Sequence, residues 1–347
     1  MTDRITLKKN DSIKLSICIP TYNRPKHLEN CLHSICLSKK NCKNFNIEIC
    51  ISDNNSDFNV LKIIRKYKQK IRIKFNKNKK NIGYALNYLK VLNLARGEYV
   101  WVMGDDEILK YNSLTILKNI LKNKDVDFIY TNSNTIEDNY ISKFKHPFNI
   151  KNLPKNMKKF SSIKKNKVTN FFGLIDYNVT WDYLLGICMC IYKRKMFIEK
   201  LHHTNMKELK KKGIWTTFHN TAFYTEIYVK AFKKSSVYIQ SNPIVVTTHG
   251  HKDWNNLYPF IKIVRIPEVI DMYRKNGLTL FSYLRQKNYA VKDFFSCMYK
   301  ILNSNYGTKY LDIYRHVLWN LFYPSIYITL IKKFLYRIIL KKKINLN

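Results

Sequence analysis

The segment Tyr99–Glu107, YVWVMGDDE, decides the fold class of this chain. Five apolar residues, which fit a strand buried on both faces, run directly into Gly104 and three acids. Adjacent carboxylates at the end of a buried strand repel each other, so a cation or solvent must offset the cost of placing them there. The segment therefore predicts a core strand that ends in a ligand-binding loop.

Three earlier segments repeat this arrangement of a short apolar strand followed by a polar loop. The strands are predicted at Leu15–Pro20, Ile47–Ser52 and Ile71–Phe75. Helical spacing of apolar residues separates them, over Arg24–Leu37, Val60–Lys70 and Tyr84–Ala95. Such alternation predicts an α/β fold, in which helices cover both faces of a mostly parallel sheet. Ligands of these sheets bind beyond the carboxyl ends of the strands, where the polar loops lie.

The later part of the chain carries further strands and helices. Strands are predicted at Asp127–Asn132, near Leu185–Tyr192 and at Ser236–Ile239. Helices are predicted at Val168–Ile175 and Ala222–Phe232, and the pattern is helical from Leu257 onward. The chain is thus expected to end in a helical extension.

The last predicted helical segment, Tyr310–Leu340, mixes aromatic and aliphatic residues with lysine and arginine. Pro324, Lys332 and Lys333 interrupt its apolar run, so it falls short of the uninterrupted stretch that spans a bilayer. A basic, aromatic segment of this kind is typical of helices that lie in the membrane interface. The alternative is a helical hairpin that packs on the core.

The composition is strongly basic: Lys and Arg number 62 against 24 Asp and Glu, which gives a formal net charge of +38. This charge attracts polyanions such as nucleic acid, anionic lipid or phosphorylated substrates. No nucleic-acid-binding motif accompanies it, so we expect no nucleic-acid partner and keep a nucleic-acid-binding protein as an alternative. With 46% hydrophobic residues, the chain is not mainly disordered.

The eight cysteines fall largely within apolar runs, without a C-x-x-C pair or zinc-ligand spacing. They are expected to be reduced core residues. Residues Met1–Asn10 lack the apolar segment of a secretory signal. A cytoplasmic location is expected from both observations.

Four polar loops at the predicted sheet edge carry the signal for function. They are Pro20-Thr21-Tyr22-Asn23-Arg24, Ser52-Asp53-Asn54-Asn55-Ser56-Asp57, Asn81-Ile82-Gly83 with Asn87, and Gly104-Asp105-Asp106-Glu107. In order and spacing, over about Lys14–Leu117, they resemble the family 2 glycosyltransferases of the GT-A fold. The Gly-Asp-Asp-Glu form is similar to the abequosyltransferase-like branch. The resemblance implies inverting transfer of a sugar from a nucleoside diphosphate to a hydroxyl, with a divalent metal.

The donor residues follow from this resemblance and from their chemistry. Asp53 can accept hydrogen bonds from a base or ribose, and the matching family position contacts the nucleoside; a turn-forming Asp is the alternative. The other residues expected to contact nucleotide or phosphate share positions in the four loops: Pro20, Thr21, Tyr22, Arg24, Asn81, Gly83 and Asp105. Two alternatives remain open: Arg24 can be a solvated surface residue, and Asn81–Gly83 can be an ordinary helix start.

The metal is expected to be Mg²⁺ or Mn²⁺, held by Asp106 and Asp105 and completed by phosphate oxygens. The family's usual first Asp is replaced by Gly104, which leaves Asp106 on the expected metal-binding position. His249 and His251 can complete the metal ligands, as a C-terminal His does in some GT-A enzymes. A loop role that touches the acceptor or diphosphate is the alternative for both.

A carboxylate must take the proton from the acceptor hydroxyl during inverting transfer. Glu226 is the first candidate, because FYTEIYVKAF resembles the family's Glu-Asp motif although Ile227 replaces the second acid. Asp182, which precedes the predicted strand near Leu185, is the second. A glutamate on an ordinary helix surface is the alternative for Glu226.

The expected organisation is a GT-A domain over residues 12–255, with a nucleotide-binding half to about 129 and an acceptor half from 130. A basic helical region over 256–347 follows, and association with a membrane is its expected role. The acceptor would be a glycan or glycolipid such as lipopolysaccharide, capsule or a lipid-linked oligosaccharide, reached at the inner face of the cytoplasmic membrane. A catalytically inactive GT-A sugar-binding protein is the other alternative.

Overall fold

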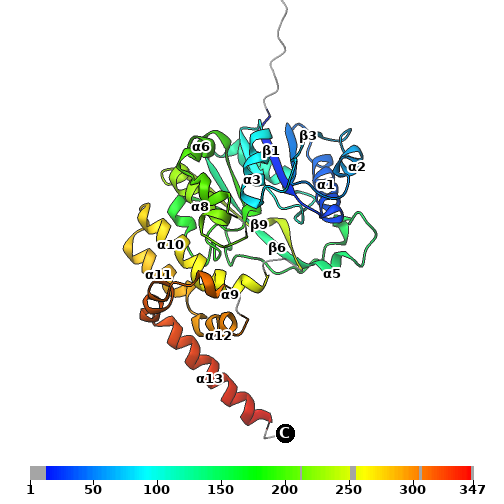
Figure 1. Cartoon of the computed structure of the whole chain (residues 1–347). Helices are drawn as coiled ribbons and strands as arrows, with labels where there is room; N and C mark the ends of the chain where they lie inside the picture. Colours follow the sequence, from blue (N-terminus) through cyan, green and yellow to red (C-terminus); the bar gives the residue numbers. More distant parts are fainter. Residues whose placement is uncertain (1–12, 212, 251–254, 305–306, 345–347) are drawn as a thin grey trace, which may run out of the picture.

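The computed structural model describes residues 13–211, 213–250, 255–304 and 307–344 (Figure 1). Its centre is a 9-stranded mixed sheet in the order β3-β2-β1-β4-β8-β6-β9-β5, with β7 paired to β9. The strands are β1 (Leu15–Thr21), β2 (Ile47–Asp53), β3 (Arg72–Lys77), β4 (Tyr99–Val102), β5 (Ile108–Leu109), β6 (Phe128–Glu137), β7 (Lys167–Asn170), β8 (Cys190–Lys193) and β9 (Ser236–His249).

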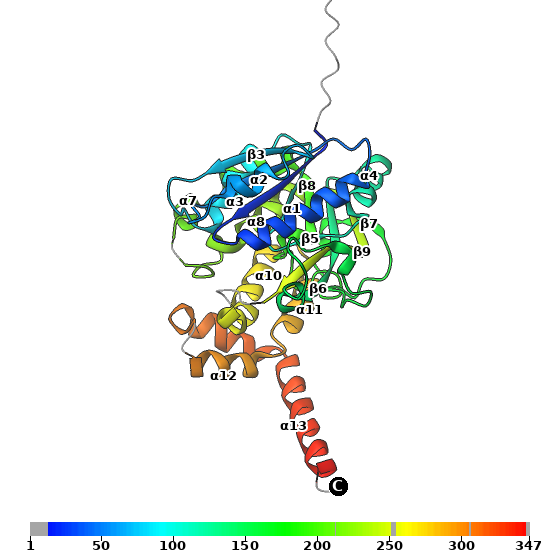
Figure 2. The ribbon, with the colours of Figure 1, turned by 90° about the vertical axis from the view of Figure 1, so that its right-hand side faces the viewer.

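Helices cover both faces of the sheet, with α1, α2 and α4 on one face and α3, α6 and α8 on the other (Figures 1 and 2). The helices of this part are α1 (Pro25–Lys40), α2 (Val60–Arg65), α3 (Tyr84–Leu94), α4 (Ser113–Asn123), α5 (Asp138–Ile141), α6 (Arg194–Glu199), α7 (Met206–Leu209) and α8 (His219–Phe232). The chain moves outward from β1 to β2 and β3, then returns across the sheet to β4. The strand order therefore reverses between β1 and β4, and such a reversal is where open α/β sheets bind ligands.

Strand β8 runs against both of its neighbours, β4 and β6. Strands β1, β2, β3 and β4 are parallel, and β6 is parallel to β9. Because β8 is reversed, β6 and β9 point in the same direction as β1 to β4. The carboxyl ends of all these strands, and the residues that lead into β8, therefore lie at one edge of the sheet.

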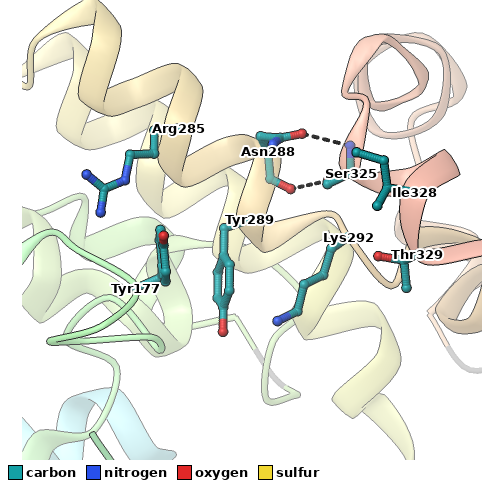
Figure 3. Close-up of a pocket in the computed structure, with 8 residues that line it drawn as sticks. All are labelled: Tyr177, Arg285, Asn288, Tyr289, Lys292, Ser325, Ile328 and Thr329. Carbon is teal, nitrogen blue, oxygen red and sulfur yellow. Dashed lines mark hydrogen bonds between the residues drawn. The ribbon is translucent and has the colours of Figure 1, made fainter. Parts of the chain in front are cut away.

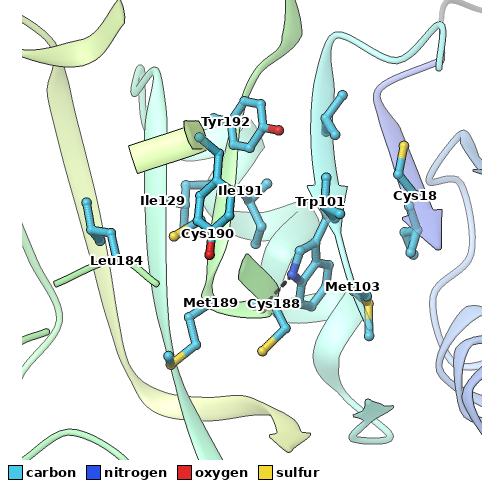
Figure 4. Packing of buried hydrophobic residues seen from close by; sticks show 14 of the residues in the cluster. Cys18, Trp101, Met103, Ile129, Leu184, Cys188, Met189, Cys190, Ile191 and Tyr192 are labelled. Atoms are coloured by element: carbon cyan, nitrogen blue, oxygen red, sulfur yellow. Dashed lines mark hydrogen bonds between the residues drawn. The ribbon is translucent and has the colours of Figure 1, made fainter. Parts of the chain in front are cut away.

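Trp101 is a fully buried side chain at the centre of this arrangement. Its ring lies between β4 and the segment before β8, and its Nε1–H donates to the carbonyl oxygen of Cys188 at 2.7 Å (Figure 4). The bond joins two segments that are 87 residues apart in the sequence. Trp101 thus fixes the loop before β8 against the end of β4.

Trp101→Phe is expected to lower the free energy of unfolding by about 2–3 kcal/mol, because it leaves a cavity and removes the buried hydrogen bond to the Cys188 carbonyl. Urea unfolding followed by circular dichroism measures the change. The matched control is Trp319→Phe, at a side chain that is 67% exposed, where a change under about 0.5 kcal/mol is expected. Equal effects of the two substitutions would contradict the structural role of Trp101.

The C-terminal region consists of α9 (Tyr258–Phe260), α10 (Ile266–Lys275), α11 (Leu280–Ala290), α12 (Phe294–Ser304) and α13 (Ser325–Ile344), with short helical turns between them. Helix α10 packs on α8, and its apolar residues belong to the main core. Helix α13 extends away from the rest of the molecule (Figures 1 and 2). Within the described residues, no helix is both long enough and apolar enough to cross a membrane.

A buried charge cluster ties this region to the α/β part. Arg265 donates from Nη1 to Glu268 at 2.6 Å and from Nε to the Trp215 carbonyl at 3.0 Å. His316 lies 3.2 Å from the other oxygen of Glu268. Removing one member would leave a buried charge without its partner, so the cluster makes the attachment specific.

The predicted strands and helices before residue 103 are confirmed, with bounds that differ by a few residues. Two later predictions are wrong. Residues 168–175 form β7 and a 3₁₀ turn instead of a helix, because β7 pairs with β9 and the Asn170 side chain accepts from the Gly173 amide at 2.9 Å. The strand near Leu185–Tyr192 is confined to β8, because a 3₁₀ turn occupies Ile187–Met189.

Candidate functional site

The candidate site forms where β1, β2 and β4 end, at the reversal of strand order. Thr21 is the register partner of Asp53, and the Thr21 carbonyl accepts from the Asn54 amide at 2.9 Å. The Thr21 hydroxyl donates to Oδ2 of Asp105 at 2.7 Å. These contacts join the first, second and fourth predicted loops at one place.

Asn23 also joins the first and second loops by hydrogen bonds. Its backbone is left-handed, with a φ of 53°. Its amide donates to the Ser56 hydroxyl at 2.9 Å, and its side chain exchanges two hydrogen bonds with Asp57. Asparagine tolerates this conformation better than most residues. These bonds fix the backbone on either side of Tyr22, a residue that is 43% exposed, and lead into Arg24.

Asp53 is fully buried, but only one of its carboxylate oxygens has a hydrogen bond. Oδ1 accepts from the Ser56 amide at 2.9 Å. Oδ2 has no hydrogen-bond partner among the residues that the structure describes. A buried carboxylate oxygen without a donor is costly, and an N–H or O–H group of a ligand can satisfy it.

The third loop is held by a network of side-chain amides rather than by charges. Asn54 donates to the Asn81 side-chain oxygen at 2.8 Å and accepts from the amide of Ile82 at 2.9 Å. The same oxygen of Asn81 accepts from the Gly83 amide at 2.9 Å. Asn81 and Gly83 therefore lie beside Asp53 as predicted by their order, and Asn81 is engaged in shaping the loop.

The fourth loop places two carboxylates against Arg24. Nη1 of Arg24 lies 3.3 Å from Asp106 and 3.7 Å from Asp105. Burial is the main cause that raises the pKa of Asp105 to about 6, and the charge of Asp106 raises it further, while Arg24 and Thr21 oppose the shift. The loop thus holds more negative charge than one arginine stabilises, which favours a cation.

The structure gives a steric reason for Gly104, which stands where the usual Asp-x-Asp sequence has its first Asp. A Cβ at this position would lie 2.5 Å from Oδ1 of Asp106. Any side chain there would displace the Asp106 carboxylate or shift the loop. An aspartate at this position is therefore incompatible with the observed placement of Asp106.

The pair Asp105 and Asp106 fits a hard divalent cation, because carboxylate oxygens are the ligands that Mg²⁺ prefers. Among the residues that the structure describes, no group of three or more His, Cys, Asp or Glu can hold a metal alone. Magnesium is commonly held by one or two carboxylates together with substrate phosphates. The residues therefore suit a cation that a bound diphosphate helps to hold.

Strand β9 reaches the same loop. Thr248 donates its hydroxyl to the Asp106 carbonyl at 2.9 Å, and His249 is the next residue. The structure thus brings the end of β9, where His249 lies, beside the loop that carries Asp106. His251 lies outside the described residues.

Sequence reasoning missed His27 and Asp138. Nε2 of His27 lies 3.2 Å from Oδ2 of Asp138, and the positive potential of His27 is one of the causes that oppose the raised pKa of Asp105. Arg24 is the residue directly before α1, and His27 follows it by three residues in the first turn of that helix. That spacing is the signal that would have found it, whereas Asp138 comes from a different part of the chain.

Glu226 lies on α8 and forms ion pairs with two residues of the same helix. Nζ of Lys230 is 2.8 Å from Oε1, and Nδ1 of His219 is 3.4 Å from Oε2. Burial would raise the pKa of Glu226, but the hydrogen bonds from His219 and Lys230 outweigh it and lower the pKa to about 2. A carboxylate held in this way is a weak proton acceptor.

Asp182 lies in the segment before β8, at the same sheet edge as Asp105, because β8 is reversed. Oδ2 accepts from the Gly186 amide at 2.7 Å, whereas Oδ1 is buried and has no hydrogen-bond partner within the described part of the chain. Burial raises the pKa of Asp182 to about 6, against the opposing effect of backbone N–H donors. A Cβ on Gly186 would lie 2.9 Å from Oδ2, so the close approach requires glycine.

Two surface pockets lie away from the four loops. One, of about 210 Å³, lies between α11, α13 and Tyr177. The other, of about 350 Å³, is lined by residues of 110–116, 150–157 and 243–244. The candidate site is defined by its contacts and its unsatisfied oxygens, and neither of these pockets coincides with it.

Comparison with known proteins gives a family for the segment that carries these loops. Residues 16–184 match the family described as Glycosyl transferase family 2. The abequosyltransferase RfbV of Salmonella typhimurium is 40% identical over 109 residues, which are 31% of this chain and 32% of that protein. The uncharacterized glycosyltransferase MG060 of Mycoplasma genitalium is 32% identical over 121 residues, 34% of this chain and 40% of that protein. The chain thus spans less than half the length of these two relatives.

The crystal structure of Staphylococcus aureus TarS 1–349 in complex with UDP covers 82% of this chain and 72% of its own, with a TM-score of 0.54. At 17% sequence identity, this likeness concerns the fold alone. It extends beyond the matched sequence segment. Residues 16–184 thus match glycosyltransferase family 2, and the likeness to TarS shows the GT-A fold over most of the chain.

Proposed function

We propose that this protein transfers a sugar from a nucleoside-diphosphate sugar to a hydroxyl of a surface-glycan acceptor, with inversion and with a divalent metal. One observation carries the proposal: Thr21 links Asp105 to the strand end beside Asp53, at the reversal of strand order. In this proposal, Asp53 contacts the nucleoside and Asp105 lies close enough to serve the diphosphate of the same donor. All four loops lie within residues 16–184, which match a family of sugar-transferring enzymes.

The donor-binding roles follow from the chemistry of each group. The buried, unpaired Oδ2 of Asp53 accepts a hydrogen bond from the base or ribose. Arg24 supplies a planar guanidinium for the diphosphate, and the exposed ring of Tyr22 supplies a stacking face. Pro20 keeps β1 extended up to this point, where it is paired with Ser52.

Asp106 and Asp105 would hold Mg²⁺ or Mn²⁺, with His249 as a further ligand. When bound, the metal neutralises the diphosphate that leaves the sugar. Thr21 keeps Asp105 in place through its hydroxyl, and Thr248 keeps the Asp106 backbone in place. The protein side of the site is thus fixed before donor binds.

Asp182 is the proposed general base, and Glu226 remains the other candidate. Two observations support Asp182: its unsatisfied Oδ1, and a pKa of about 6, which keeps it ionised yet basic near neutral pH. Glu226 has the opposite properties, with two cationic partners and a pKa of about 2. In this assignment Asp182 takes the proton of the acceptor hydroxyl as that oxygen attacks the sugar carbon.

The acceptor is proposed to be a growing lipopolysaccharide, capsule or lipid-linked oligosaccharide at the inner face of the cytoplasmic membrane. The exposed aromatic residues and the basic charge of the C-terminal helices support a peripheral membrane contact. The domain division at residues 12–255 and 256–347 is part of this proposal. The first part carries donor and acceptor sites, and the second carries the membrane contact.

A panel of nucleoside-diphosphate sugars tests the function. One donor, present at a hundred times its Kd with Mg²⁺ or Mn²⁺, is expected to stabilise the fold by about 2.7 kcal/mol and raise Tm by about 4 °C. The same donor with a chelator is the control, and radiolabelled transfer to membrane glycolipid is the second readout. Salt-sensitive DNA binding without any donor effect would indicate the nucleic-acid-binding alternative. Donor binding without transfer or hydrolysis would indicate an inactive sugar-binding protein.

A further inference from the structure

The pocket at the base of α13 lies outside the donor site. It has a volume of about 210 Å³ and is formed by α11, the first turn of α13 and the loop that carries Tyr177 (Figure 3). Its lining combines two cations, two tyrosines, and side chains with hydroxyl or amide groups: Tyr177, Arg285, Asn288, Tyr289, Lys292, Ser325, Ile328 and Thr329. No step of sugar transfer uses these residues.

The two cations of the pocket are positioned by aromatic rings. Tyr177 and Tyr289 stack with ring centroids 4.1 Å apart and an interplanar angle of 14°. Arg285 lies 5.0 Å from the Tyr177 centroid, and Lys292 lies 3.7 Å from that of Tyr289. The stack is drawn side-on in Figure 3. A cation held on a ring keeps its N–H donors available for an anion.

The charge of the pocket is positive. Arg285 is paired with Asp176 at 2.8 Å, but Lys292 has no carboxylate partner among the described residues. Three of the four acids after residue 255 are already in ion pairs with the protein: Glu268, Asp271 and Asp293. The fourth, Asp312, accepts from the Arg315 amide. An anion from outside therefore finds a cation that the protein leaves uncompensated.

Neutral hydrogen-bond donors complete the pocket. Oδ1 of Asn288 accepts from the Ser325 amide at 3.0 Å, which leaves its NH₂ group as a donor beside the cavity. Thr329 lines the cavity one helical turn after Ser325, and its hydroxyl oxygen is drawn on the side of Lys292 in Figure 3. An ammonium, an amide and a hydroxyl are the donors that bind a phosphate group.

The helices that form the pocket, and the turns before α13, expose many large apolar side chains. Phe281 on α11 is 76% exposed, and Phe322, close before α13, is 78% exposed. The helices α11 and α13 and the turns between α12 and α13 also expose Leu284, Tyr314, Leu318, Trp319, Ile328, Ile331, Phe334 and Tyr336. Exposed aromatic and aliphatic side chains beside uncompensated cations match an anionic lipid surface, in which rings insert and cations meet phosphates.

We propose that this pocket binds the phosphate of an anionic phospholipid headgroup and so docks the C-terminal helices on the bilayer. This inference rests on the proposed function, because docking would hold the enzyme at the membrane that carries its acceptor. Lys292, Asn288 and Thr329 contact the phosphate, and the exposed side chains of α11 and α13 contact the acyl region. Charge complementarity selects this occupant over an uncharged apolar partner.

Vesicle co-sedimentation of the full chain tests the inference. We expect the wild-type protein to bind vesicles of phosphatidylglycerol and phosphatidylcholine, and to bind pure phosphatidylcholine vesicles at least tenfold more weakly. Lys292→Glu is expected to weaken binding to the anionic vesicles about tenfold, because it replaces attraction at the phosphate with repulsion. Lys122→Glu, an equal charge change on the exposed surface of α4, is expected to weaken it less than twofold.

A second variant and a phosphate titration distinguish lipid binding in the pocket from misfolding, diffuse attraction and binding of free phosphate. Lys292→Gln, which removes the charge, is expected to give an intermediate loss, and an unchanged Tm of both variants excludes misfolding. Equal losses for Lys292→Glu and Lys122→Glu would reject the pocket in favour of diffuse attraction. Thermal stabilisation by inorganic phosphate that Lys292→Glu removes, with vesicle binding unchanged, would reject the lipid as its ligand. The assay contains no donor sugar, so its outcome is independent of whether the transfer activity is correct.

Discussion

Replacing Asp106 with Asn is expected to lower the rate of sugar transfer about a thousandfold while the free energy of unfolding changes by less than about 1 kcal/mol. The large kinetic effect follows because a metal contributes several kcal/mol of charge stabilisation to a leaving diphosphate. The small stability effect follows because the substitution loses the 3.3 Å ion pair with Arg24 but relieves repulsion of Asp105. Single-turnover transfer and urea unfolding measure the two quantities.

Donor binding provides a second readout for the same variant. The Tm increase caused by donor and metal in the wild type is expected to disappear in Asp106→Asn. The control is Asp125→Asn, the same chemical change at a fully exposed side chain, which should leave transfer, donor binding and stability as they are. A transfer rate within threefold of the wild type in Asp106→Asn would refute the metal assignment.

Replacing Asp182 with Asn is expected to abolish transfer and, at pH 7.5, to stabilise the fold. The side chain is ionised at that pH although burial raises its pKa to about 6. A pKa that rises from about 4 in the unfolded chain to this value corresponds to about 3 kcal/mol of cost for the buried charge. Asn removes this cost and keeps an acceptor for the Gly186 amide. A gain of about 1–3 kcal/mol in unfolding free energy is therefore expected together with the loss of activity.

The pH dependence of this gain has a definite sign. Because the folded pKa lies above the unfolded one, the contribution of Asp182 to stability is fully present below the unfolded pKa and is lost as pH rises through about 6. The difference between variant and wild type should thus shrink from pH 7.5 towards pH 4. The wild-type transfer rate should fall about tenfold per unit below pH 6, as the base is protonated.

Glu226→Gln is the matched comparison. It removes the partner of Lys230 and His219, so it is expected to destabilise the fold by about 1 kcal/mol at neutral pH. Transfer should persist in this variant within about tenfold of the wild type. Loss of transfer in Glu226→Gln with normal rates in Asp182→Asn would reverse the assignment of the base.

The first hundred residues made the fold predictable from the sequence, because each strand there is a local apolar run that stops at a polar loop. Tyr99–Glu107 alone carries both a core strand and its acids. The loops around Thr21, Asp53 and Asp105 could be placed at one edge, because parallel strands send their carboxyl ends to the same side. Their actual contact, through the Thr21 hydroxyl, bears out that placement.

Other features depend on contacts that no local pattern contains. The reversed direction of β8 is set by pairing with β4 and β6, and β7 is a strand only because β9 lies beside it. The sequence alone favoured Glu226 over Asp182 as the general base. It did not show that Glu226 is held in ion pairs on its helix face. The pocket at Lys292 is lined by Tyr177 and by residues of α13, which are far apart in the sequence. The composition shows that the chain is basic, but it does not show that these residues form a pocket.

The reversed strand β8 also affects the order in which the sheet can fold. The edge of the sheet is finished only when β8 and β9 have paired with strands that were synthesised roughly a hundred residues earlier. Such distant pairings raise contact order and slow folding. A nascent chain that has emerged only as far as the loop after β4 therefore carries Asp53 and Asp106 but lacks β8 and β9. Recovery of activity after dilution from urea should lag behind recovery of helical signal.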